Sequence, residues 1–142
     1  MRFRKSAHAV YKTEYHVVWI PRYRRKVFVK GVKEYADKLL ANIPDLDKDI
    51  EVIKVNVRLD HIHMVIVIPP RIAVADVIQF IKSQSGKLIR AKFAFLDNVM
   101  KSREGLWSRG YCVSSVGLDE KRILAYVTHQ EKEDRGQLRL GF

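Results

Sequence analysis

The apolar segment from Met64 to Ile68, closed by two prolines, constrains the fold most strongly. Its β-branched residues predict a buried strand over 61–68 that the prolines end. The preceding segment, 50–58, alternates apolar with polar residues, which predicts a half-buried strand. Only Leu59 and Asp60 separate the two segments, so we expect them to form an antiparallel hairpin.

Further elements are predicted on both sides of this hairpin. Aromatic and β-branched residues over 11–20 predict a first strand, and apolar residues at helical spacing over 32–43 and 74–93 predict two helices. A loop over 97–110 leads to a short strand over 111–116, and Asp119 is a candidate N-cap for a last helix. The order β-α-β-β-α-β-α predicts an α+β, ferredoxin-like antiparallel sheet with an additional C-terminal helix. In that fold the first and third strands are central.

The chain is expected to form a single domain over residues 1–142, since 142 residues can bury a core without disulfides. A polar tail at about 132–142 follows the last helix, and we expect it to be flexible. The N-terminus lacks the apolar centre of a signal peptide, and no apolar stretch approaches the roughly 20 residues that cross a bilayer. The single cysteine, Cys112, fits a reducing compartment. We therefore expect a cytoplasmic protein with no membrane partner.

The charge balance indicates a polyanionic partner. Lysine plus arginine total 27 against 16 aspartate plus glutamate, a formal net charge of +11. Such an excess is typical of proteins that bind nucleic acid.

Four cations surround one aromatic residue in the segment 21–26 (PRYRRK). Arg22, Arg24, Arg25 and Lys26 can contact phosphates, while Tyr23 can stack on an unpaired base. The alternative is a solvated turn that positions the first strand. We assign these four cations to DNA contacts as a hypothesis.

Two histidines flank one hydrophobic residue where the buried strand begins. Side chains alternate across a strand, so His61 and His63 are expected on the same face. Two imidazoles are too few for a tight zinc site, which takes four protein ligands or three with water. A third ligand is therefore needed. Gln130 offers an amide oxygen, which suits Mg²⁺ or Mn²⁺.

Other side chains are rivals for the third ligand. They are Asp60, His129 and His16. His129 is next to Gln130, but adjacent helical side chains point about 100° apart.

A tyrosine on the last helix is a candidate nucleophile. Tyr126 and Gln130 are four residues apart, so a helix brings them to one side. A tyrosine that attacks a DNA phosphodiester forms a phosphotyrosine and releases a 3′-hydroxyl, so rejoining needs no nucleotide cofactor. In agreement, the sequence contains no GxxxxGK[ST] or GxGxxG phosphate-binding motif.

These motifs resemble a known family. The blocks YHVVWIPRYRRKVF, DHIHMVIVIPP, IKSQSGKLI, LWSRGYCVSSVG and YVTHQ, in this order, are similar to the IS200/IS605-type single-strand DNA transposases of the HUH endonuclease superfamily. The resemblance covers most of the chain. It implies that His61 and His63 bind a divalent ion, Mg²⁺ or Mn²⁺, that Gln130 is the third protein ligand, and that Tyr126 is the only nucleophilic tyrosine.

The resemblance also implies partners. Such transposases cleave and rejoin single-stranded DNA at insertion-sequence ends that form hairpins. They act as homodimers, in which the tyrosine helix of one subunit can complete the histidine site of the other in trans. Trp107 and Tyr111 are expected to pack beneath the site or at the dimer interface.

Two alternatives remain on sequence grounds. A non-catalytic nucleic-acid-binding module with the same fold would carry stacking aromatic residues on its central strands, whereas the strand over 61–68 is aliphatic beyond its histidines. A domesticated relative that nicks hairpins without mobilising itself would have the same chemistry.

Overall fold

The computed structural model describes residues 3–29, 31–100 and 105–136. Its main sheet has four strands: β3 (Glu14–Trp19), β4 (Glu51–Val57), β5 (Ile62–Val67) and β6 (Cys112–Ser114). They lie in the order β4-β5-β3-β6, and each neighbouring pair is antiparallel. This is the predicted ferredoxin-like arrangement, with the first and third strands of this sheet at its centre.

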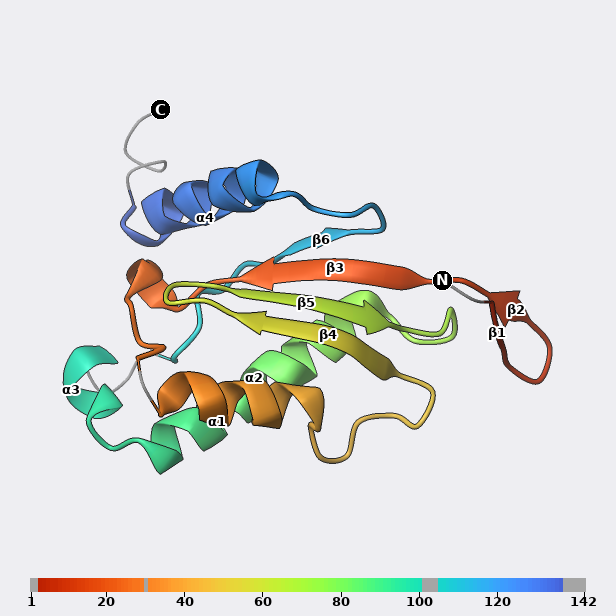
Figure 1. Ribbon diagram of the computed structural model, residues 1–142, viewed down its shortest axis with the longest axis horizontal. Helices are drawn as coiled ribbons and strands as arrows, with labels where there is room; N and C mark the ends of the chain where they lie inside the picture. The colour runs from red at the N-terminus through yellow and green to blue at the C-terminus, as the bar shows by residue number, and fades with distance from the viewer. Residues whose placement is uncertain (1–2, 30, 101–104, 137–142) are drawn as a thin grey trace.

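Helices cover both faces of the sheet (Figure 1). Helices α1 (Val32–Ala41) and α2 (Val74–Lys92) lie below it in that view, and α4 (Glu120–Asp134) lies above it. Helix α1 begins after Gly31, whose φ of 91° is strained for other residues. Asp119 caps α4 as predicted, because its carboxylate accepts a hydrogen bond from the backbone N–H of Arg122 at 2.9 Å.

The alternation of side chains along the central strands divides the interior into two clusters. Ile62, Met64 and Ile66 of β5 are fully buried in the larger cluster, which packs against α1 and α2. On β3, Val17 joins this larger cluster, whereas Val18 joins the smaller one with residues of α4. The side chains of His63 and Val18 therefore lie on the α4 face, as expected from the period of two.

Two elements differ from the prediction near the N-terminus and in the long loop. The first strand was expected over 11–20, but β1 (Arg4–Lys5) and β2 (Val10–Tyr11) form a separate hairpin that projects from the body (Figure 1). The loop over 97–110 contains most of a short helix, α3 (Leu96–Met100), while residues 101–104 lie outside the described part. Leu96 and Met100 are fully buried, so the helix closes one end of the core.

The C-terminal boundary also differs. Helix α4 continues to Asp134, so the expected tail at about 132–142 begins too early. Asp134 accepts hydrogen bonds from two groups of the body, the Tyr23 N–H and the Ser108 hydroxyl, and these contacts explain the longer helix. Residues 137–142 lie outside the described part. Across the described residues, no helix is both long and apolar enough to cross a membrane.

Candidate active site

The paired histidines lie at the start of β5 and share one cavity. His61 precedes the strand, and its Nδ1 is 2.9 Å from Asp60 Oδ1. This contact fixes Nδ1–H as the donor to the carboxylate and leaves Nε2 as the free nitrogen, the usual support for a metal-binding imidazole. Burial alone would raise the pKa of Asp60, but hydrogen bonds from His61 and Arg24 outweigh it and lower that pKa.

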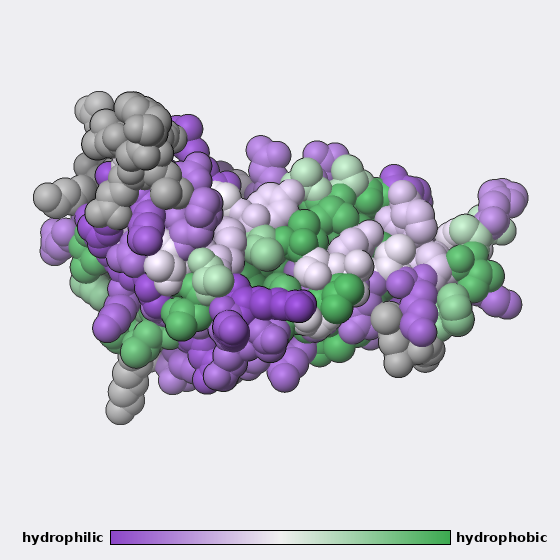
Figure 2. Space-filling model, turned by 90° about the horizontal axis from the view of Figure 1, so that it is seen from above, coloured by the Kyte–Doolittle hydropathy of each residue, from purple (hydrophilic) through white to green (hydrophobic). Residues whose placement is uncertain are grey.

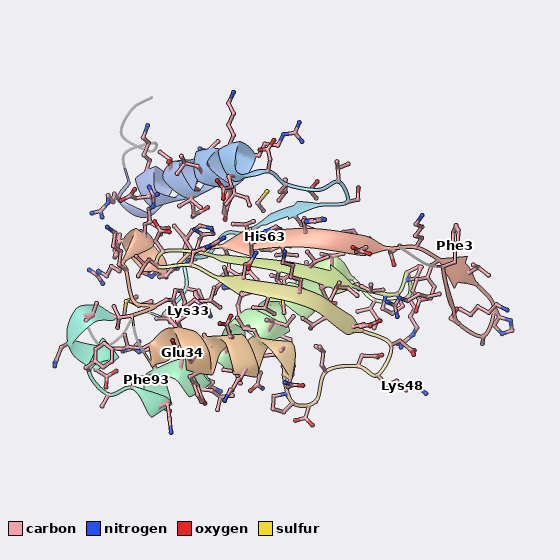
Figure 3. The ribbon with its side chains drawn as sticks, in the orientation of Figure 1. Phe3, Lys33, Glu34, Lys48, His63 and Phe93 are labelled. Carbon is pink, nitrogen blue, oxygen red and sulfur yellow. The ribbon has the colours of Figure 1, made fainter. Side chains whose placement is uncertain are left out.

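The second histidine of the pair contacts a third imidazole. His63 Nε2 is 3.1 Å from Nδ1 of His16 on the neighbouring strand β3. Burial lowers the pKa of His63, and the nearby His16, His61 and Lys54 lower it further. The imidazole therefore stays neutral, the form that binds a metal ion. Figure 3 labels His63 in the sheet, well away from the projecting hairpin that carries Phe3.

The cavity beside the histidines is lined by charged side chains of both signs. Its volume is about 920 Å³, and α4 closes it with Ile123, Leu124 and Val127. Its charged lining comprises four cationic side chains, Arg24, Lys26, Lys33 and Arg58, and three carboxylates, Asp60, Asp119 and Glu120. A cavity that combines imidazoles with several cations suits a phosphate-bearing ligand.

Tyr126 and Gln130 lie together on α4, as predicted. The Tyr126 hydroxyl is 3.5 Å from Gln130 Oε1. The tyrosine ring packs against the smaller cluster together with Cys112. Burial raises the pKa of Tyr126 well above its usual range, and Cys112, Asp134 and Glu133 raise it further. The hydroxyl is therefore neutral near pH 7.

Within one chain, the histidine pair and the pair of Tyr126 and Gln130 do not line the same cavity. The described lining of the histidine cavity includes Leu124 of α4 but neither Tyr126 nor Gln130. Successive helical residues are about 100° apart, so Leu124 and Tyr126 project from opposite flanks of α4. In the sheet, Val18 of β3 separates the two sides, because its neighbours on the adjacent strands are His63 of β5 and Cys112 of β6.

The rival ligands have other partners. His129 is exposed and pairs with Glu133 at 3.5 Å. Asp60 binds His61 and Arg24, which makes it a support for the histidine. His16 contacts His63 and remains the rival closest to the pair. Among the described residues, no three His, Cys, Asp or Glu side chains form a group that could hold a metal ion.

The basic segment makes several contacts within the chain. Arg24 pairs with Asp60 at 2.7 Å and with Glu131 at 3.3 Å. Arg25 lies over the Tyr23 ring, 5.0 Å from its centroid. The backbone N–H of Arg22 donates to Leu106 O, and Lys26 lines the histidine cavity. These contacts give the segment a structural role, and its DNA contacts stay a prediction.

A buried polar network around Gln130 was not predicted from the sequence. Gln130 is only 7% exposed, and its Nε2 is 2.7 Å from Ser108 Oγ and 3.1 Å from Asp134 Oδ1. Lys82 Nζ donates to the carbonyl oxygens of Ser108 and Gly110. The four-residue helical spacing from Gln130 to Asp134 is a signal that sequence reasoning could have used. Ser108 and Lys82 have no such local signal.

Gly110 leaves the space that Gln130 occupies. A Cβ at position 110 would lie 2.5 Å from Gln130 Oε1. The Gly110→Ala variant must therefore displace the glutamine, which would break its bonds to Ser108 and Asp134. We expect a loss of about 1–3 kcal/mol in the free energy of unfolding, measured by urea denaturation.

Gly105→Ala is the matched control for this substitution. A Cβ at position 105 meets no atom within 4 Å, so its free energy of unfolding should change little. Equal stability of the two variants would show that Gln130 is not held in place.

The chain is similar to known transposases. The profile of the family described as "Transposase IS200 like" matches residues 9–130. The chain is 31% identical over 129 residues to the transposase for insertion sequence element IS200 of Salmonella typhimurium, which covers 91% of this chain and 84% of that protein. It is 28% identical over 137 residues to the ISDra2 transposase TnpA of Deinococcus radiodurans. This match covers 94% of this chain and 95% of that protein.

A solved structure is also similar. The crystal structure of a putative transposase from Deinococcus radiodurans R1 superposes with a TM-score of 0.77 at 26% sequence identity. The match covers 89% of this chain and 97% of that chain.

Proposed function

This chain belongs to the family of IS200-like transposases, and on that basis we propose that it cleaves and rejoins single-stranded DNA through a covalent 5′-phosphotyrosine at Tyr126. The substrate would be the hairpin-forming ends of an insertion sequence. The observation that carries this proposal is the position of the Tyr126 hydroxyl, 3.5 Å from the amide oxygen of Gln130. A nucleophile and a candidate metal ligand thus lie side by side on one helix.

The donor set fits a hard divalent ion, Mg²⁺ or Mn²⁺. His61 keeps Nε2 free because Asp60 accepts from its Nδ1. The Gln130 amide oxygen faces the Tyr126 hydroxyl, because the amide nitrogen is bound to Ser108 and Asp134. We propose His61, His63 and Gln130 as the residues that hold the ion, which would polarise the phosphate and help the 3′ oxygen leave.

The proposed reaction exchanges one ester for another. Tyr126 Oη attacks the phosphorus atom, the bond to the 3′ oxygen breaks, and the tyrosine proton passes to that oxygen to give a free 3′-hydroxyl. Burial raises the pKa of Tyr126, so in this proposal the hydroxyl enters the step protonated and loses its proton during the attack. Attack by a 3′-hydroxyl on the phosphotyrosine reverses the step and rejoins the strand.

We also propose that the active site is completed in a homodimer. The histidines and Tyr126 lie on opposite flanks of α4, so a second subunit could bring its tyrosine to the first subunit's histidines. Strand β6 is at the edge of the described sheet, where an unpaired edge can meet a partner. Val113 and Val116 are exposed on or next to it. Figure 2, seen from the α4 side, shows hydrophobic surface gathered in the middle of that face.

The cations of the first loop would contact the DNA backbone. Arg24 and Lys26 line the cavity beside the histidines, and we propose phosphate contacts for them together with Arg22 and Arg25. A DNA substrate fits a location in the cytoplasm.

The test uses labelled single-stranded DNA from the flanks of the gene, folded into its hairpins. With Mg²⁺, the protein should form an adduct that survives denaturation, and EDTA should prevent it. The released fragment should be extended by terminal transferase, which requires a 3′-hydroxyl. His61→Ala should reduce adduct formation by about 10²-fold or more. Tight binding without an adduct would contradict the proposal and favour a non-catalytic binding module.

A further inference from the structure

Both N–H groups of the Gln130 side chain are already used within the chain. Its Nε2 is 2.7 Å from Ser108 Oγ and 3.1 Å from Asp134 Oδ1. A carboxylate only accepts hydrogen bonds, so the nitrogen, and not the oxygen, must face Asp134. Gln130 Oε1 is therefore left facing the Tyr126 hydroxyl.

The groups that hold Gln130 are themselves held. Asp134 Oδ1 also accepts from Ser108 Oγ at 2.7 Å, and Oδ2 accepts from the backbone N–H of Tyr23 at 2.9 Å. Both backbone groups of Ser108 are hydrogen-bonded: its N–H donates to Ile20 O, and its carbonyl oxygen accepts from Lys82 Nζ. Both oxygens of Asp134 thus face donors, and the direction of every bond in the network is determined.

We propose that Asp134 and Ser108 are positioning residues, which rotate the Gln130 amide so that its oxygen faces the metal position beside Tyr126. This inference rests on the proposed role of Gln130 as a metal ligand. An amide turned by 180° would present NH₂ at the same place, and NH₂ does not bind Mg²⁺ or Mn²⁺. The network therefore decides whether the side chain can be a ligand at all.

The Asp134→Asn variant tests the direction of these bonds with little change of shape. Asparagine has one accepting and one donating group, whereas Tyr23, Ser108 and Gln130 all donate to Asp134. If the asparagine oxygen faces Tyr23, its NH₂ faces Gln130, and the glutamine must turn its own oxygen inward. Its NH₂ would then face the metal position.

A compensating change reverses the effect. In the Gln130→Glu variant, two carboxylates face each other across the network. Adding Asp134→Asn removes that conflict, because the introduced asparagine can donate to the introduced glutamate and accept from the Tyr23 N–H at the same time. Asp134→Asn is therefore expected to weaken metal binding when residue 130 is glutamine and to strengthen it when residue 130 is glutamate.

The experiment measures Mn²⁺ binding to the full chain without DNA, by the electron paramagnetic resonance signal of free Mn²⁺. We expect Asp134→Asn to weaken binding by about 10–100-fold in the Gln130 background and to strengthen it in the Gln130→Glu background. Glu133→Gln removes the same charge one residue away, from a side chain whose partner among the described residues is the exposed His129, and should bind Mn²⁺ like the unchanged chain. Ser108→Ala, which keeps the Asp134 contact, should weaken binding less.

Two results would overturn the inference without contradicting the proposed metal site. The first is unchanged Mn²⁺ binding in Asp134→Asn. The second is an equal loss of Mn²⁺ binding on Asp134→Asn in the Gln130 and Gln130→Glu backgrounds, which would mean that Asp134 has a purely structural role. Urea denaturation separates the second result from unfolding. If the unchanged chain does not bind Mn²⁺, or if His61→Ala binds it equally well, the proposed metal site itself is wrong and the inference falls with it.

Discussion

Replacing Tyr126 with phenylalanine is expected to abolish the covalent adduct and to reduce strand cleavage by on the order of 10³-fold or more. The substitution removes only the hydroxyl, the proposed nucleophile. The phenyl ring keeps its packing with Ile123, Val127 and Cys112, so stability should change little. The measurements are adduct formation on a denaturing gel and urea denaturation of the same preparation.

The matched control is Tyr111→Phe, since Tyr111 packs against the larger cluster beneath the sheet and should keep full activity. Mixing the Tyr126→Phe and His61→Ala proteins then tests the proposed dimer. If each site takes histidines from one subunit and the tyrosine from the other, a mixed dimer contains one intact site and the adduct returns. An adduct that persists in Tyr126→Phe alone would identify a different nucleophile.

The largest loss of stability is expected for Trp107→Ala, about 3–5 kcal/mol in the free energy of unfolding. The indole is 6% exposed and lies 5.7 Å from Trp19 and 5.6 Å from Phe28, between ring centroids. Its Nε1 donates to the buried Ser85 Oγ at 3.1 Å. The alanine variant would leave a cavity and remove the donor to Ser85 Oγ, which would keep only its own bond to Lys82 O, and urea denaturation measures the sum.

Two variants calibrate this value. Trp107→Phe keeps a ring in the cavity and should lose less than Trp107→Ala. Phe95→Ala removes an aromatic ring that is 46% exposed, so its cost should be much smaller. A similar loss for Trp107→Ala and Phe95→Ala would contradict the central place of Trp107 in the core.

Most of the fold could be predicted because its long elements have clear periods. The strand pair β4 and β5 and the helices α1 and α2 appear within two residues of their predicted bounds. The hairpin of β1 and β2 was not predicted, apart from Tyr11 at the start of the expected first strand, because each of its strands is only two residues long, too short for a period of two to show. Helix α3 is only five residues long, too short for a helical period to show.

The candidate site was predictable within each element but not between elements. Spacing along one helix placed Tyr126 beside Gln130, and alternation along β5 placed the histidines. The sequence does not show which flank of α4 faces the histidines, because that depends on how Ile123 and Val127 pack against Val18. The contacts of Ser108 with Gln130 and Asp134 join residues from a loop and a helix, so no local pattern encodes them.

The indole of Trp107 also restricts position 86 of α2. A Cβ on Gly86 would lie 3.3 Å from the indole Cδ1, closer than side chains normally approach. A side chain at position 86 should therefore be tolerated better beside a smaller ring at position 107. Covariation of these two positions among relatives would then record how the loop packs on α2, in a form that can be read from sequences alone.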